Sequence, residues 1–242
     1  MMTIFIVLNK YIMFMSTCSF FNSKQFNFLK SLKPDEKVSF LENFSKQKFK
    51  KGDIIFFENE ELQQIFCITE GFCKLSKENK KDEELITNLL GCGEVMGRRS
   101  VLTQKGALLT ATAITDVTLC CIPKKLVLDT INSNNNFCQD ILNGFIVDSE
   151  DDIKKIEFYK NNCKIKQRLA GLLIYTLEKF GVDTNGWLKV SLKRQDIANI
   201  LGTTTEYIIS ILSSFKEKKY VSFKKGKMKL ISTIALKELM TF

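Results

Sequence analysis

The sequence predicts an α+β chain with an amino-terminal β-barrel and a carboxy-terminal winged helix-turn-helix. Short apolar segments alternate with turns between residues 44 and 123, as in all-β barrels and sandwiches. Residues 190–229 instead contain two segments with helical apolar spacing, separated by a glycine turn and followed by a lysine-rich hairpin. At 242 residues with 45% apolar content, the chain can build a core in each of two domains.

The first fifteen residues form an apolar run that Asn9 and Lys10 interrupt. This run is too short for a membrane-spanning helix, and it lacks the basic start and the Ala-x-Ala cleavage site of a signal peptide. We therefore expect no membrane partner. We also expect residues 1–19 to be an extension, with translation starting at Met13 or Met15.

The predicted strands of the amino-terminal domain are bounded by turn-forming residues. Lys51-Gly52-Asp53 precedes a strand at 54–57, and Glu70-Gly71 separates strands at 65–68 and 72–75. Further strands are predicted at 85–90, 108–113 and 117–122, and the segment from Gly91 to Gly97 follows the first of these.

The helix pair begins with a predicted helix over 194–201, where Ile197, Ile200 and Leu201 share one face. Gly202 ends this helix, because glycine accepts the left-handed conformation of a helix cap.

Thr203 or Thr204 is predicted to cap the free amides at the start of the second helix. Glu206, three residues after Thr203, suits a capping box and the positive end of the helix dipole. The buried stripe is predicted to contain Ile208, Ile211, Leu212 and Phe215. The opposite face, which would meet the major groove, is predicted to contain Thr205, Glu206, Ile209, Ser210, Ser213 and Ser214.

A short hairpin is predicted after the helix pair, with one strand at 220–223 and its partner at 228–231. Its tip contains Lys224, Lys225, Gly226 and Lys227, which would lie near phosphates beside a recognition helix. Many helix pairs share a glycine turn, and lysines also occupy ordinary solvated loops. DNA binding is nevertheless the better interpretation of the combined pattern.

The charge distribution supports a polyanionic partner for the carboxy-terminal domain. The chain carries a net charge of +9. Residues 163–242 contain 15 basic and 6 acidic residues, whereas the first 162 residues contain 21 of each. Neutralising phosphates with such an excess drives nucleic-acid binding. A lysine-rich composition throughout the chain would not place the whole surplus in one domain.

Several residue types argue against catalysis. The chain has no histidine, no phosphate-cradling glycine loop and no dinucleotide-binding glycine pattern, so we expect no enzyme activity. Its eight cysteines lack the spacing of a metal site or a disulfide framework, which favours a reducing cytoplasm. Cys67, Cys73, Cys92, Cys120 and Cys121 fall in strand-like segments and are expected to pack as small hydrophobes, with redox sensing as the alternative.

Four motifs in this order make the chain resemble the Crp-Fnr family of bacterial transcription regulators from about residue 20 onward. They are Lys51-Gly52-Asp53-Ile54-Ile55, Ile68-x-Glu70-Gly71-x-x-Lys74-Leu75, Gly93-Glu94-x-x-Gly97 and Arg194-Gln195-Asp196-Ile197-Ala198-x-x-Leu201-Gly202. The resemblance implies a cyclic-nucleotide-binding-like jelly roll over 20–136, a dimerisation helix over 137–162 and a DNA-binding domain over 163–242. It also implies a homodimer that binds a near-palindromic stretch of double-stranded DNA under an unidentified signal. RNA polymerase and a small anionic effector are further candidate partners.

The dimerisation helix is expected from about residue 137 to 161, followed by a second helix over 165–180. Its dimer seam is expected to contain Leu142, Ile146, Ile153 and Ile156, which lie near heptad positions. The alternative is an amphipathic helix packed on its own barrel. The acidic run at 148–152 favours that alternative, because two copies would repel each other.

The resemblance points to a candidate effector pocket that contains Gly93, Glu94, Lys105, Gly106, Ile153 and Lys154. Members that respond to cyclic AMP hold its phosphate with an Arg-Ser pair where this chain has Lys105-Gly106. They contact its adenine with Thr-Ser where this chain has Ile153-Lys154. These departures argue against cyclic AMP and leave another anionic ligand, or none. A lone Cys18 near the amino terminus argues against an iron–sulfur cluster, so no cofactor is predicted.

The recognition helix also departs from the family pattern. Members commonly read bases with Arg-Glu-x-x-x-Arg, whereas this chain has Thr205-Glu206-Tyr207-Ile208-Ile209-Ser210. Both guanine-reading arginines are absent, although Glu206 can accept from cytosine N4. We therefore expect greater reliance on phosphate contacts and on the shape of AT-rich DNA. The alternative is a small-molecule-binding or interaction protein with only nonspecific DNA affinity. The candidate DNA-contacting residues are Lys193, Arg194, Thr203, Thr204, Thr205, Glu206, Ser210, Ser213, Lys224, Lys225 and Lys227.

Overall fold

The computed structural model describes residues 30–79, 83–103, 105–160 and 164–240, without the side chains of residues 41 and 151–160. The described chain forms two compact units. One contains the residues up to Lys77 and those from Asn88 to Asp151, and the other contains Glu78–Thr87 and the residues from Asp152 onward. The expected extension at 1–19, the start at Met13 or Met15, and Cys18 lie outside the described residues. No helix in the described part is long and apolar enough to cross a membrane.

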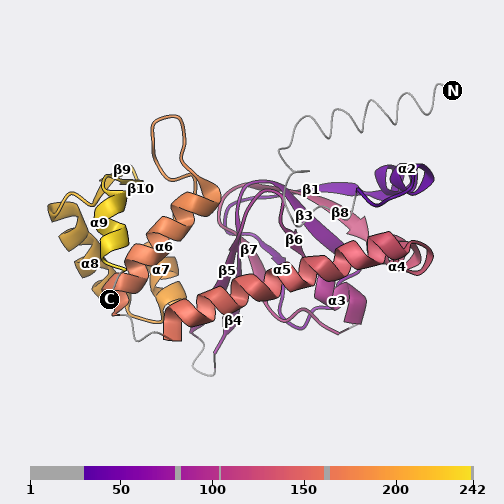
Figure 1. The fold of residues 1–242 in the computed structure, drawn as a ribbon, viewed down its shortest axis with the longest axis horizontal. Helices are drawn as coiled ribbons and strands as arrows, with labels where there is room; N and C mark the ends of the chain where they lie inside the picture. Colours follow the sequence, from indigo (N-terminus) through magenta and orange to yellow (C-terminus); the bar gives the residue numbers. More distant parts are fainter. Residues whose placement is uncertain (1–29, 80–82, 104, 161–163, 241–242) are drawn as a thin grey trace. The chain divides into compact units, whose positions relative to one another are not determined.

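The first unit is built on two antiparallel sheets (Figure 1). One sheet has the strand order β1 (Ser45–Phe49), β8 (Val117–Pro123), β3 (Gln64–Glu70) and β6 (Val95–Met96). The other has the order β2 (Ile54–Phe56), β7 (Thr110–Ala113), β4 (Cys73–Glu78) and β5 (Glu84–Leu90), and the residues of β4 and β5 within Glu78–Thr87 group with the second unit. The jelly roll implied by the resemblance is therefore present, although the strands form two separate sheets and the expected barrel is not closed.

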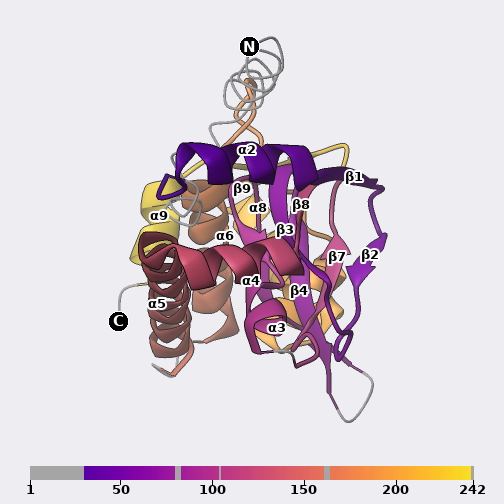
Figure 2. The same cartoon turned by 90° about the vertical axis from the view of Figure 1, so that its right-hand side faces the viewer.

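In the described residues, four helices accompany these sheets. Helices α2 (Pro34–Asn43) and α4 (Lys124–Ser133) both contact β8, and α3 (Arg98–Thr103) contacts β3 (Figure 2). The long helix α5 spans Asn135–Lys160 and begins two residues before the predicted start. It begins there because the Asn134 side-chain oxygen accepts a hydrogen bond from the Phe137 backbone nitrogen at 3.1 Å, as an N-cap does.

The predicted strands are present in the structure, but their end residues differ from the prediction. The strand expected at 54–57 stops at Phe56, because Phe57 is 58% exposed and its nitrogen donates to the Glu60 carboxylate. The strand expected at 72–75 begins at Cys73, because Gly71 turns the chain with φ +86°. The strand expected at 108–113 begins only at Thr110. In the first two cases a side chain or a glycine forms a turn in place of a residue that was expected in a strand.

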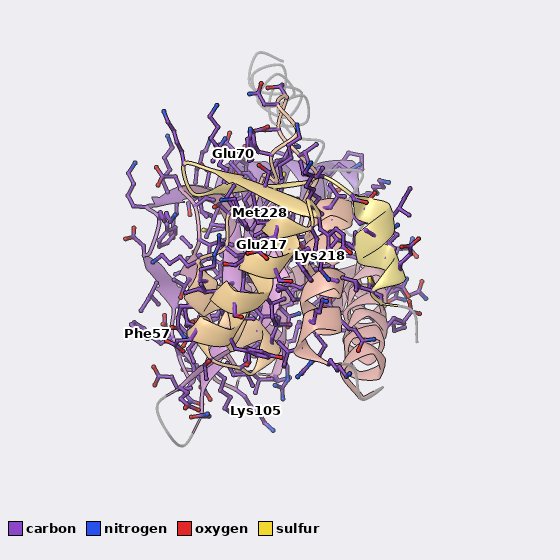
Figure 3. The ribbon with its side chains drawn as sticks, turned by 90° about the vertical axis from the view of Figure 1, so that its left-hand side faces the viewer. Phe57, Glu70, Lys105, Glu217, Lys218 and Met228 are labelled. Carbon is purple, nitrogen blue, oxygen red and sulfur yellow. The ribbon has the colours of Figure 1, made fainter. Side chains whose placement is uncertain are left out.

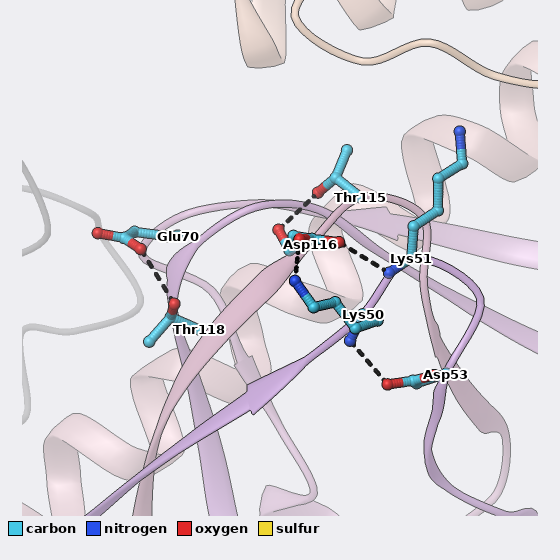
Figure 4. Close-up of polar contacts among 7 residues, drawn as sticks. All are labelled: Lys50, Lys51, Asp53, Glu70, Thr115, Asp116 and Thr118. Atoms are coloured by element: carbon cyan, nitrogen blue, oxygen red, sulfur yellow. Dashed lines mark hydrogen bonds and ion pairs between the residues drawn. The ribbon is translucent and has the colours of Figure 1, made fainter.

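Polar side chains stabilise the turns of the first two family-like motifs (Figure 4). The Asp116 carboxylate accepts hydrogen bonds from Lys50 Nζ at 2.9 Å and from the Lys51 nitrogen at 3.1 Å. The hydrogen bond from Lys50 lowers the pKa of Asp116 below its usual value. Asp53 likewise accepts from the Lys50 nitrogen at 2.7 Å, so the Lys51-Gly52-Asp53 turn has a structural role.

Four of the five cysteines expected in strands are buried: Cys67, Cys73, Cys120 and Cys121. Burial raises the pKa of Cys73 to about 12 and that of Cys121 to about 11. Cys92 was wrongly expected in a strand. It lies in the turn between β5 and β6, where it is exposed.

Alkylation of the folded protein should therefore be selective. With iodoacetamide at pH 8, we expect Cys92 to react before Cys73 and Cys121, because the raised pKa values leave little thiolate at the buried sites. Peptide mass mapping over a time course measures the order. Equal rates at the three thiols would contradict the packing role of the buried pair, and unfolded protein serves as the equal-rate control.

The second unit contains the helix pair and the hairpin. Helix α6 spans Ile165–Phe180, α7 spans Arg194–Leu201 and α8 spans Thr205–Glu217. Strands β9 (Val221–Lys224) and β10 (Lys227–Leu230) pair antiparallel, and α9 (Thr233–Glu238) contacts α6. The largest fully buried side chains of this unit are Leu169, Ile197, Leu201, Ile208 and Phe215.

Candidate nucleic-acid interface

The turn between α7 and α8 has the predicted geometry. Helix α7 ends at Leu201, and Gly202 takes the left-handed conformation with φ +64° and ψ +50°. Helix α8 is capped by Thr204, whose hydroxyl accepts from the Tyr207 nitrogen at 3.3 Å. Thr204, one of the two predicted caps, is confirmed, whereas the capping box between Thr203 and Glu206 is wrong because the cap lies one residue later. Glu206 still lies in the first turn of α8, where the helix dipole favours a carboxylate.

Helix α8 has the predicted two-faced character. Its buried residues are Ile208, Ile211, Leu212 and Phe215. Glu206, Ser210 and Ser213 are exposed, as a groove-facing surface requires. Tyr207 and Ile209 are also about half exposed, at 49% and 48%. Tyr207 was not among the predicted DNA-contacting residues, although its position in the first turn of the helix was a signal for an exposed site residue.

The hairpin after α8 has a two-residue turn. Lys224 pairs with Lys227 at the strand ends, and Lys225 and Gly226 form the tip with φ +48° and +77°. Two positive φ angles are typical of the type I′ turn that matches the twist of a hairpin. The Ser191 hydroxyl stabilises this tip by donating to the Gly226 carbonyl at 2.7 Å. The predicted lysine-rich wing is therefore a defined hairpin.

The lysines of this wing are not equivalent. Lys227 Nζ forms an ion pair with Asp183 at 2.9 Å, and the hydrogen bond in this pair lowers the pKa of Asp183. Lys224 and Lys225 are exposed and form no ion pair with the described residues. These two ammonium groups can therefore reach phosphates without first breaking an internal contact.

The two basic residues at the start of α7, Lys193 and Arg194, also differ in their exposure and contacts. Lys193 is exposed. The Arg194 guanidinium lies 4.6 Å from the centre of the Phe223 ring, and its partial burial lowers its pKa. This cation–π contact connects α7 with the first strand of the wing. Arg194 therefore positions the wing as well as offering charge to DNA.

Thr205 is half-buried, and its hydroxyl is already hydrogen-bonded within the protein. It donates to the Gln195 side-chain oxygen at 2.7 Å, and the Gln195 amide donates to Asn199 at 2.8 Å. Sequence reasoning did not include Gln195 or Asn199 among the site residues. The only available signal was the place of Gln195 in the Arg194-Gln195-Asp196 motif.

The candidate effector residues that the structure describes make hydrogen bonds or close contacts within the protein. Gly93 donates its nitrogen to the Ile68 carbonyl at 2.8 Å, and a Glu94 carboxylate oxygen accepts from the Gly91 nitrogen at 2.8 Å. Lys105, labelled in Figure 3, is exposed, and its carbonyl accepts from the Ser100 hydroxyl. A methyl group on Gly106 would lie 2.4 Å from the Asn59 carbonyl oxygen, so this glycine permits close packing of two loops. The side chains of Ile153 and Lys154 lie outside the described residues.

Sequence reasoning missed Arg98, a buried cation of the first unit. Only 4% of it is exposed, and its Nη2 atom pairs with Asp148 of α5 at 2.5 Å. Its guanidinium lies 5.4 Å from the centre of the Phe145 ring, and a methyl group on Gly144 would lie 2.1 Å from Nη1. Arg98 thereby ties α3 to α5. A buried arginine needs such a partner because an unpaired charge in a core is costly.

Helix α5 has exposed apolar residues at the predicted spacing. Leu142 is 55% exposed and Ile146 is 57% exposed, four residues apart on one helix face. The side chains of Ile153 and Ile156, the other two expected seam residues, lie outside the described residues. Large apolar side chains exposed on a helix are typical of a surface that another helix covers.

A jelly roll, a long helix and a winged helix-turn-helix with an exposed basic hairpin define a class of two-unit DNA-binding regulators. The family model of the cyclic nucleotide-binding domain matches residues 46–134, and that of the Crp-like helix-turn-helix domain matches residues 167–240. The chain belongs to the Crp-Fnr family of transcription regulators. These matches point to regulators and not to a family of enzymes.

Similar proteins agree with this assignment. The global nitrogen regulator of Synechococcus elongatus is 24% identical over 199 residues, which cover 79% of this chain and 88% of that protein. The CRP-like cAMP-activated global transcriptional regulator of Mycobacterium tuberculosis is 21% identical over 192 residues, covering 76% and 82%. Among solved structures, FixK2 from Bradyrhizobium japonicum has the same fold, with a TM-score of 0.70, 16% identity and coverage of 82% of this chain and 98% of that one.

Proposed function

We propose that this regulator binds a near-palindromic operator as a homodimer, with one α8 helix in each of two successive major grooves roughly 34 Å apart. The observation that carries the proposal is the exposed polar face of α8 beside a wing whose Lys224 and Lys225 make no ion pair with the described residues. The localised positive charge of residues 163–242 supplies the attraction to phosphates.

We propose that direct contacts with bases contribute little to DNA recognition and that contacts with the phosphate backbone contribute more. Lys193, Arg194 and Thr204 at the start of the helix pair, with the wing lysines, contact phosphates in this proposal. Thr205 and Ser210 stand where family members commonly carry guanine-reading arginines. AT-rich DNA suits this arrangement, because its narrow minor groove is read through shape.

The proposed dimer forms through α5. Leu142 and Ile146 supply the exposed apolar surface that a second copy covers. In solution, Leu142→Asp with Ile146→Asp should therefore shift the protein from dimer to monomer in sedimentation velocity. Leu108→Asp, at another exposed apolar residue, should leave the dimer intact and is the matched control.

Control of DNA binding is proposed to come from the jelly roll in a cytoplasmic protein, through a signal that shifts the population of DNA-binding conformers. A small anionic effector and RNA polymerase remain proposed partners, and no metal or iron–sulfur cofactor is proposed. Cyclic AMP is not proposed, because Lys105 is exposed and Gly106 is packed against Asn59.

Selection of bound sequences from a random duplex library at two salt concentrations tests this function. We expect an enriched inverted repeat that is rich in A·T pairs. Salt-sensitive binding without enrichment would instead indicate a nonspecific DNA-binding protein, and invariant guanines in each half-site would contradict the proposed readout.

The second prediction concerns substitutions of the wing lysines. Lys224→Ala and Lys225→Ala should each reduce the slope of log K against log salt by about 0.9, as expected for one lost phosphate contact. Lys227→Ala should change the slope less, because Asp183 holds its ammonium group. Fluorescence anisotropy of the selected duplex at several salt concentrations measures the slopes. Equal effects of all three substitutions would contradict the inequivalence of these lysines.

A further inference from the structure

A directed series of side-chain hydrogen bonds starts at the first residue of α8 and crosses α7. Thr205 Oγ1 donates to Gln195 Oε1 at 2.7 Å, and Gln195 Nε2 donates to Asn199 Oδ1 at 2.8 Å. Asn199 Nδ2 then donates to a carboxylate oxygen of Glu84 at 3.0 Å. Glu84 begins β5 and belongs to the segment 78–87 that groups with the second unit.

The carboxylate at the end of the series sets the direction of every bond. The Glu84 carboxylate accepts from Asn199, so Asn199 presents its amide nitrogen to it. The Asn199 oxygen then faces Gln195, which must donate to it and turn its own oxygen toward Thr205. The Thr205 hydroxyl is consequently required to donate its one proton to Gln195.

This arrangement restricts what Thr205 can offer to DNA. With its proton used, the hydroxyl presents only oxygen lone pairs, together with the methyl group of the side chain. Adenine N6 and cytosine N4 can donate to such an oxygen, and a thymine methyl group can pack against the threonine methyl. Guanine offers only the acceptors N7 and O6 in the major groove, so it is the base that the arrangement disfavours.

We propose that Gln195 is a specificity-determining residue, which makes Thr205 select against guanine by accepting its hydroxyl proton. The proposal rests on the proposed function, because it requires α8 to lie in the major groove. Gln195 acts through Thr205 and is a positioning residue. It is exposed, so its replacement leaves the core of the unit unchanged.

The test is sequence selection by the full-length protein and four variants: Gln195→Ala, Gln195→Glu with Asn199→Ala, Thr205→Val, and Gln195→Ala with Thr205→Val. The half-site position whose base preference differs between the wild type and Thr205→Val is the position that faces Thr205. There, guanine should be depleted roughly five- to tenfold by the wild type, as expected for one unmet hydrogen bond at a base edge. Gln195→Ala frees the hydroxyl proton and should reduce the depletion to about twofold or less.

Two comparisons separate this role from a general loss of binding. Gln195→Glu with Asn199→Ala keeps an acceptor for the Thr205 proton and removes the Asn199 oxygen that would repel the new carboxylate, so guanine depletion should persist even where the negative charge weakens overall affinity. In the Thr205→Val background there is no hydroxyl proton, so adding Gln195→Ala should leave the base preference unchanged. Thermal unfolding followed at Trp187, the single tryptophan, confirms that each variant is folded.

The outcomes distinguish the inference from the function on which it rests. An enriched inverted repeat with the same guanine depletion in wild type and Gln195→Ala overturns the inference alone. Loss of the depletion both in Gln195→Ala and in Gln195→Glu with Asn199→Ala also overturns it, because the acceptor would then be irrelevant. Failure of the wild type to enrich any sequence rejects the proposed operator recognition, and the inference with it.

Discussion

Replacing Gly71 with alanine should destabilise the first unit by about 2–6 kcal/mol, the combined cost of a strained backbone and an overpacked site. Gly71 has φ +86°, which side chains rarely adopt, and an added methyl group would lie 2.2 Å from the Asp116 carbonyl oxygen. The same methyl group would lie 2.9 Å from Thr115 Oγ1, which accepts a hydrogen bond from the Phe72 nitrogen. Relief of these contacts requires the turn before β4 to move away from the turn before β8.

Gly52→Ala is the matched control for this prediction. Gly52 also has a positive φ, +98°, but nothing lies within 4 Å of an added methyl group. It should therefore show only the conformational cost, about 1–2 kcal/mol. Urea unfolding followed by circular dichroism measures both variants. Equal destabilisation by the two substitutions would show that the contact with Asp116 contributes nothing.

Phe215→Ala should destabilise the second unit by about 3–5 kcal/mol and abolish operator binding. Phe215 is fully buried on α8, and its ring centre lies 5.8 Å from that of Tyr220. Removing the ring leaves a cavity beneath the helix that carries the DNA-contacting side chains. Because most single domains are stable by only about 5–15 kcal/mol, α8 would then lose its fixed position in a large fraction of molecules.

Ile209→Ala separates this packing effect from an effect at the DNA surface. Ile209 lies on the same helix but is 48% exposed, so its replacement should change stability by no more than about 0.5 kcal/mol. Trp187, the single tryptophan, lies in the second unit and reports its unfolding by fluorescence. Operator binding is measured on the same samples by fluorescence anisotropy. Wild-type stability of Phe215→Ala would refute the assigned core.

The parts of the fold that sequence reasoning predicted best are those with local signals. The bounds of α6 and α7 agree with the prediction because periodic apolar residues and a glycine cap lie within the segments themselves. The short helices α3 and α4 were not predicted. Helix α3 is only 6 residues long and packs on β3, a strand distant in sequence, so tertiary contacts outweigh local propensity. Helix α4 has 10 residues and packs on β8, the strand directly before it.

The candidate site residues also divide into those with a local sequence signal and those that depend on tertiary contacts. The exposed face of α8 and the wing lysines could be read from spacing and charge. Arg98 could not be identified, because its burial depends on Asp148 and on the space that Gly144 leaves, about fifty residues away in sequence. The Gln195 contact with Thr205 was equally hidden, since it joins side chains of two helices whose packing brings them together.

The sequence by itself determined the order of the two units, the family and the charge of the DNA-binding end, because composition, periodicity and motifs are properties of the linear chain. Only the tertiary structure decided which polar groups remain available for contacts with a partner. It shows that Lys227 is paired, that the Thr205 proton is used, and that Arg98 is buried. A hydrogen bond or an ion pair forms between groups that folding brings within about 3 Å, and no local pattern records that distance.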